Sequence, residues 1–83
     1  MVELNRAVAV GLAAGPDAGL ELLEPLLAAP VLARYQPLRA VHAELLSRAG
    51  DAEGAAQVYG RAIDLTANDV ERAELQRRLD ALR

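Results

Sequence analysis

The chain contains no cysteine, no lysine, no phenylalanine and no tryptophan. Without cysteine it forms neither disulfides nor thiolate metal sites. Its only aromatic residues are two tyrosines, so the core has to be built mainly from alanine, leucine and valine. It also lacks any apolar run near the roughly 18 residues of a membrane span, and its start does not resemble a signal peptide. These absences predict a soluble cytoplasmic domain.

The charge pattern argues against nucleic-acid binding. The 83 residues carry a net charge of −3, and all nine basic residues are arginine. A duplex-binding surface needs clustered cations that displace counterions from phosphates, whereas most of these arginines are spaced among acids. The densest basic spot, which is interpreted as a solvated face, has acids within about a turn of it. Its residues are Arg77, Arg78 and Arg83, and the acids are Glu71, Glu74 and Asp80.

An internal repeat organises the chain. GPDAGLELLEPLL at 15–27 matches GDAEGAAQVYGRA at 50–62 with an offset of 35 residues, which places Gly15 on Gly50 and Gly19 on Gly54. A period near 34 residues, with two helices per unit, is typical of the tetratricopeptide repeat (TPR). Such α-solenoids usually bind other proteins.

Helical periodicity predicts five helices. The first covers Val2–Ala14, the second opens at Pro16, the third covers Pro37–Ala49, and Asp51 and Asn68 cap the fourth and fifth. The side chains expected to face inward are Leu4, Val8, Leu12, Leu20, Leu23, Leu27, Leu38, Val41, Leu45, Ala49, Ala55, Tyr59, Ala62, Ile63, Leu75, Leu79 and Leu82.

Glycine and proline mark where these helices should end. Gly15 and Gly50 are expected to take left-handed cap conformations. Pro25 lies inside the second helix, where it costs about 3 kcal/mol and predicts a kink or break near Glu24. The stretch 28–36 precedes another proline and should be irregular. Asn68 and Glu71, three residues apart, suit a capping box.

The second half fits the TPR pattern better than the first. With Gln36 at the first position, small residues fall at the eighth, twentieth and twenty-seventh, where paired helices touch, and Tyr59 falls at the twenty-fourth. The departures are Arg39 where a large apolar residue is usual, Ala67 where proline usually closes the unit, and Glu24 opposite Tyr59. The small residues are Ala43, Ala55 and Ala62.

These observations predict an all-α fold of antiparallel helical hairpins. Two TPR-like units, about 1–35 and 36–69, should be followed by a C-terminal capping helix over about 69–82.

A closer resemblance lies in VELNRAVAV at 2–10 and AELLSRAGDAEGAAQVYGRAIDLTANDVERAELQRRL at 43–79. These strings resemble the C-terminal extension of a group of bacterial extracytoplasmic-function (ECF) RNA polymerase sigma factors. In that family the promoter-recognising regions lie upstream and the extension is TPR-like. The resemblance implies an excised regulatory segment that modulates transcription initiation through its own sigma regions or RNA polymerase.

No enzymatic site is predicted. His42 is the only histidine, and without cysteines or a spaced acidic cluster no metal site can be drawn. Ser47 has no base on its own helix face. Carboxylate pairs such as Glu21 with Glu24 fit a solvated face. The glycines follow no strand, so no phosphate loop or cofactor site is expected.

A partner-binding groove is the one site hypothesis. In TPR pairs the first helix of each unit lines the concave side, which places Asn5, Ala9 and Leu12 beside Ala40, Glu44 and Ser47. The candidate contacts are Asn5, Arg6, Glu44 and Arg48, although ordinary solvent exposure explains them equally well. Two alternatives remain open. One is self-association, with the face Leu75, Leu79 and Leu82 buried across a two-fold axis of a homodimer. The other is an adaptor fragment of an unrelated TPR protein.

Overall fold

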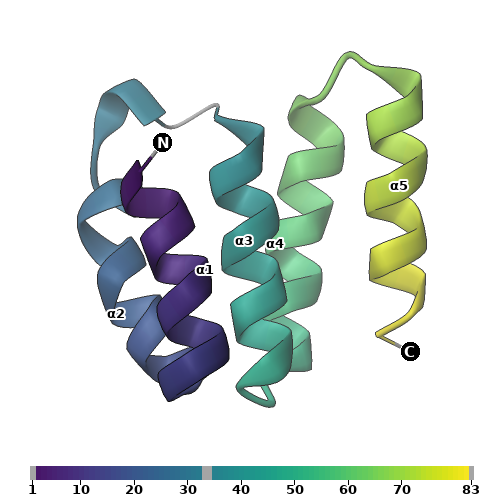
Figure 1. The fold of residues 1–83 in the computed structure, drawn as a ribbon. Coiled ribbons are helices and arrows are strands. Elements are labelled where there is room, and N and C mark those ends of the chain that lie inside the picture. Colours follow the sequence, from purple (N-terminus) through teal and green to yellow (C-terminus); the bar gives the residue numbers. More distant parts are fainter. Residues whose placement is uncertain (1, 33–34, 83) are drawn as a thin grey trace.

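The protein is an all-α stack of antiparallel helices (Figure 1). The computed structural model describes residues 2–32 and 35–82. Adjacent helices pair, so that α1 with α2 and α3 with α4 form two hairpins and α5 packs against α4. This confirms the predicted fold class. The elements are α1 (Val2–Ala14), α2 (Pro16–Leu27), the 3-10 turn η1 (Pro30–Leu32), α3 (Gln36–Arg48), α4 (Ala52–Leu65) and α5 (Asp69–Asp80).

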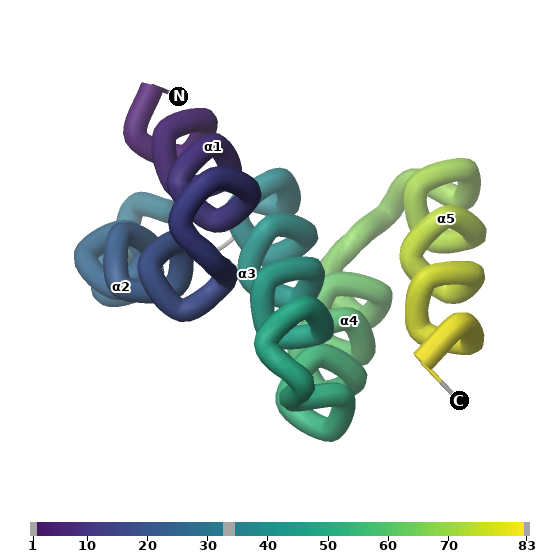
Figure 2. Tube along the Cα trace, turned by 60° about the horizontal axis from the view of Figure 1, so that its bottom comes forward, coloured from purple at the N-terminus to yellow at the C-terminus, as the bar shows by residue number. Residues whose placement is uncertain are grey.

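The helices form a thin slab with principal extents of 32 × 30 × 17 Å. Figure 2 shows α1, α3 and α5 along one side of the slab and α2 and α4 along the other. The first helix of each hairpin therefore shares a face with α5. The outer side of α5 is polar, with Arg72, Gln76, Arg77 and Asp80 exposed, as expected for a helix that caps a repeat array.

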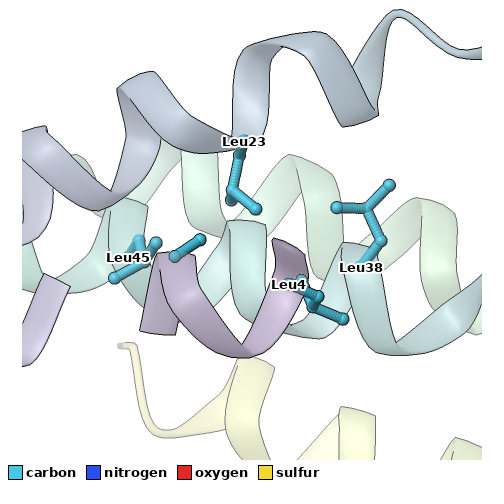
Figure 3. Close-up of a cluster of buried hydrophobic side chains, with 5 residues drawn as sticks. Leu4, Leu23, Leu38 and Leu45 are labelled. Atoms are coloured by element: carbon cyan, nitrogen blue, oxygen red, sulfur yellow. The ribbon is translucent and has the colours of Figure 1, made fainter. Parts of the chain in front are cut away.

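The first core cluster joins the first hairpin to α3. Leu4 of α1, Leu23 of α2, and Leu38 and Leu45 of α3 converge there, together with Ala7 (Figure 3). Leu38 and Leu45 are seven residues apart and so occupy one stripe of α3, which faces back toward the first hairpin.

The second cluster lies between α3, α4 and α5. Tyr59 is its largest buried side chain, and Leu46, Ile63, Leu79 and Leu82 pack against the cluster. Small residues of α3 and α4 let those two helices approach closely, as the repeat pattern predicted. The buried members are Ala43, Ala55, Tyr59, Ala62 and Leu75.

Burial corrects the register of the repeat. The two largest fully buried side chains, Leu23 and Tyr59, are each the eighth residue of their helix and are 36 residues apart. The expected offset of 35, which placed Glu24 opposite Tyr59, is therefore wrong in the second helices. The cause is the turn between the helices of each hairpin: Gly15 alone separates α1 from α2, whereas three residues separate α3 from α4.

Several residues expected inside lie outside. Leu12 is 63% exposed, Leu27 is 41% exposed, and Ala49 is exposed at the end of α3. In α1 the buried stripe is Leu4, Ala7 and Gly11. Ala7 and Gly11 occupy the buried positions where α1 crosses α2, because the backbone of the two helices is so close there that a Cβ atom on Gly19 of α2 would stand 3.0 Å from the Cα atom of Gly11.

Of the kink or break expected near Glu24, the break is wrong. Helix α2 continues through Pro25 to Leu27, and the amide of Ala28 still donates to the carbonyl oxygen of Glu24 at 3.1 Å. Pro25 and Glu21 are both exposed, so water can satisfy the carbonyl of Glu21 that loses its partner. Of the linker predicted over 28–36, residues 33 and 34 lie outside the described residues. The described part contains η1, and α3 begins at Gln36.

The predicted helix ends are largely confirmed. Gly50 has a φ of 90°, and its amide and that of Asp51 bond back to Ser47 and Leu46 at 3.1 and 2.9 Å, which is the Schellman pattern. Gly15 also has a positive φ, 107°, but its ψ of 154° is extended and not left-handed helical.

The N-terminal cap of α4 forms as predicted, and the capping box of α5 forms only in part. The Asp51 carboxylate accepts a hydrogen bond from the Gly54 amide at 2.8 Å. The Asn68 side chain accepts one from the Glu71 amide at 3.0 Å. The reciprocal half of the capping box is missing, because the Asn68 amide donates to the Thr66 hydroxyl instead, at 3.3 Å.

Candidate partner-binding groove

A groove of about 200 Å³ runs between α1, α3 and α5. Apolar side chains form its floor, and charged side chains of α3 and α5 stand at its rim. The lining residues are Val8, Leu12, Ala40, Val41, Glu44, Leu45, Arg48 and Arg78. An apolar floor with a charged rim suits the docking of an amphipathic protein segment.

The floor is apolar because the smallest residues of α1 pack against α2 and its larger aliphatic residues face the other way. Ala7 and Gly11 face the close crossing with α2, and this turns Val8 and Leu12 toward the groove. The two are four residues apart and so lie one above the other on α1. Leu12 thus offers an exposed apolar surface beside the rim.

Two ion pairs organise the rim. Arg48 Nε donates to Glu44 Oε1 at 3.1 Å, and Arg78 Nε donates to Glu74 Oε1 at 3.2 Å. Each pair is about half exposed, so neither contributes much to stability. Their effect is to hold the charged groups at fixed places along α3 and α5.

Tyr59 links this rim to the core. Burial of the side chain raises the pKa of its phenol, and the neighbouring Glu44 carboxylate raises it further. A hydrogen bond and the positive charge of Arg78 act in the opposite direction. Tyr59 and Arg78 therefore link α4 to α5 close to Glu44 of α3, and all three side chains line the same hollow.

The groove continues along α5. A hollow of about 480 Å³ includes Glu44, Tyr59 and Arg78 in its lining, and another of about 200 Å³ includes Ala40 and Arg78. Arg78 thus lines all three depressions. The three depressions therefore adjoin one another at Arg78.

Two of the four predicted contacts line the groove. Glu44 and Arg48 do, whereas Asn5 and Arg6 are exposed on α1 outside the lining. Sequence reasoning missed Arg78, which it assigned to a solvated basic spot. It counted Leu12 both with the inward stripe of α1 and with the concave side, because helical spacing does not show which face is buried, and the structure places Leu12 in the groove beside Ala40 and Glu44.

The predicted self-association face lies against the second core cluster. Leu75 is buried there, and Leu79 and Leu82 are partly buried and pack on the same cluster. A second copy would have to compete with α4 for these side chains.

Other candidate chemistry is dispersed. Ser47 borders the hollow near Tyr59, while His42 lines a different depression. Over residues 2–32 and 35–82 no group of three or more histidines or carboxylates is arranged to hold a metal ion. In the same part of the chain, no helix combines the length and apolar character needed to cross a membrane.

Comparison with known proteins shows one distant relative and no family. An uncharacterized protein of Rhizobium meliloti (strain 1021) is 39% identical over 82 residues, which cover 99% of this chain and 19% of that protein. The chain therefore spans about a fifth of the length of this relative. No protein-family model matches the chain. No solved structure matches it either.

Proposed function

We propose that this chain is a protein-interaction module that regulates transcription initiation, with the groove between α1, α3 and α5 as its binding surface. The partner is a segment of the promoter-recognising sigma regions or of RNA polymerase, as the resemblance to the ECF sigma extension implies. The observation that carries the proposal is the apolar floor of half-buried Val8 and exposed Leu12 beside the charged rim.

The chemistry of the groove favours binding over catalysis. Its polar groups are paired carboxylates and guanidinium groups, and its aliphatic surface is contributed by separate helices. Aliphatic anchors flanked by charges provide affinity and orientation for a helical or extended segment. The Rhizobium relative adds support of another kind, since four fifths of its chain lie outside the match and leave room for further regions.

The test is a binding titration. The labelled chain is titrated, with fluorescence anisotropy as the readout, against core RNA polymerase and against the upstream regions of an ECF sigma factor that carries such an extension. The variant Leu12→Asn with Glu44→Ala removes one floor contact and one rim charge. We expect it to weaken binding at least about tenfold, equivalent to about 1.4 kcal/mol.

The matched control is Val31→Asn with Glu21→Ala. It likewise removes one exposed aliphatic side chain and one carboxylate, and neither residue lines the groove. Equal losses in both variants, or no binding to polymerase and sigma regions alike, would disprove the proposal. Adding Asn5→Ala then shows whether the bound segment extends along α1 beyond the lining.

A further inference from the structure

A second depression, of about 390 Å³, lies at the seam between the two hairpins. The end of α2, the turn η1, and the helices α3 and α4 all contribute to it, and it shares no lining residue with the groove. We call it the seam pocket. Its lining residues are Leu27, Leu32, Leu38, Arg39, His42, Gln57, Val58 and Arg61.

The seam pocket is cationic in an acidic protein. Among the described residues, two guanidinium groups and one imidazole line it and no carboxylate does, although the chain has twelve acidic residues. Among residues 2–32 and 35–82, no carboxylate forms an ion pair with Arg61. Positive charge in a depression with apolar walls creates a potential that attracts anions.

The remaining walls are mostly apolar. Leu27, Leu32, Leu38 and Val58 form them, and Leu27 is 41% exposed. The repeat pattern usually places a large apolar residue at the position of Arg39. The seam therefore has a charged side chain beside uncovered leucine, which suits a ligand with both an anionic and an apolar part.

We propose that the seam pocket binds a small amphipathic anion, a carboxylate with an apolar tail. Arg39 and Arg61 hold the carboxylate, since guanidinium groups match its planar geometry. The tail covers Leu27 and Val58. The volume falls within the range of about 300–1,000 Å³ that is typical of small-molecule pockets. This inference is independent of partner binding in the groove.

His42 provides an internal reporter of this site. Burial lowers the pKa of its imidazole, and the positive charge of Arg39 lowers it further. Arg39 and Arg61 are the charged groups in the same lining. A bound carboxylate offsets these positive charges and so raises the pKa of His42. Because His42 is the only histidine, its ring signals in an NMR titration are unambiguous.

The experiment uses three probes. The chain is titrated with octanoate, with octan-1-ol and with inorganic phosphate, while the pKa and chemical shifts of His42 are followed by NMR. We expect a saturable response to octanoate with a raised pKa, and at least tenfold weaker responses to the alcohol and to phosphate. An equal response to octan-1-ol, an equal response to phosphate, or no response to octanoate would each overturn the proposal.

Paired variants locate the site. Arg61→Gln should weaken octanoate binding at least tenfold, because Arg61 lines the pocket. Arg77→Gln is the control, since Arg77 is exposed on α5 and lines none of these depressions. Circular dichroism verifies that both variants are folded. Unchanged octanoate affinity in folded Arg61→Gln contradicts the assignment.

Discussion

Gly19 of α2 crosses Gly11 of α1 so closely that a Cβ atom on Gly19 would stand 3.0 Å from the Cα atom of Gly11. The same atom would stand 2.8 Å from the carbonyl oxygen of Ala7. Both obstacles belong to the backbone, which cannot move aside as a flexible side chain can. The crossing of the first hairpin therefore depends on the absence of a side chain at Gly19.

Gly19→Ala should destabilise the protein. Overpacking of this kind costs about 1–3 kcal/mol, which outweighs the gain in helix propensity of up to about 1 kcal/mol. The control is Gly60→Ala, because a Cβ atom at Gly60 meets nothing within 4 Å and the substitution should stabilise α4. Urea unfolding of both variants gives the comparison. A stabilised Gly19→Ala variant would show that α1 and α2 do not cross in this way.

A second prediction concerns the register of the repeat. Leu23→Ala should lower the free energy of unfolding by about 2–5 kcal/mol, because Leu23 is fully buried in the first core cluster. Glu24→Ala should change it by no more than about 0.5 kcal/mol, since Glu24 is exposed. Chemical denaturation measures both values. A large loss at Glu24 together with a small loss at Leu23 would restore the 35-residue offset.

The half-formed cap of α5 gives a third prediction. Asn68→Ala should cost about 0.5–2 kcal/mol, because it removes the acceptor for the Glu71 amide. Glu71→Ala should cost less, because the Asn68 amide bonds to Thr66 and not to the Glu71 side chain. Thermal melts of the two variants test this difference. Equal destabilisation would indicate a complete, reciprocal capping box.

A fourth prediction concerns pH. The pKa of His42 lies below its ordinary value of 6.5 because the side chain is partly buried near Arg39. Between the lowered folded pKa and 6.5 the unfolded chain binds more protons, so the free energy of unfolding rises with pH through that window. Below the folded pKa this contribution is constant. Titration of the His42 imidazole alone produces this contribution to the free energy of unfolding.

His42→Gln isolates this contribution. The variant lacks the imidazole, so the difference in stability between wild type and variant should increase from acidic pH up to about 6.5 and then level off. Urea unfolding at a series of pH values between 4 and 8 measures it. A difference that is the same at every pH would mean that folding does not perturb this histidine.

The helix boundaries could be predicted from the sequence because their signals are local. Gly50 ends α3, Asp51 caps α4 and Asn68 caps α5 through contacts with residues at most five positions away. Pro16 similarly opens α2. Each signal acts on its own turn of backbone, whatever the rest of the chain does. Pro25 was misjudged because exposure, a tertiary property, decides what its missing hydrogen bond costs.

Which face of each helix is buried could be predicted only in part. In α4 the buried residues Ala55, Tyr59 and Ala62 followed from spacing, because one stripe of that helix is clearly apolar. In α1 the apolar residues surround the helix, so spacing did not distinguish Leu4 from Leu12. The groove shares this uncertainty, since Leu12 became part of its floor only through the packing of α1 on α2.

By itself the sequence determined that five helices form, where most of them begin and end, and that they pair as hairpins, because capping and periodicity act within a few turns of the chain. The tertiary structure alone decided the 36-residue register, the exposure of Leu12 and the position of Arg78 over Glu44 and Tyr59. Those features depend on how closely separate helices approach one another. The side chains of all the helices together set the distance between them, so this distance cannot be derived from any one segment of the sequence.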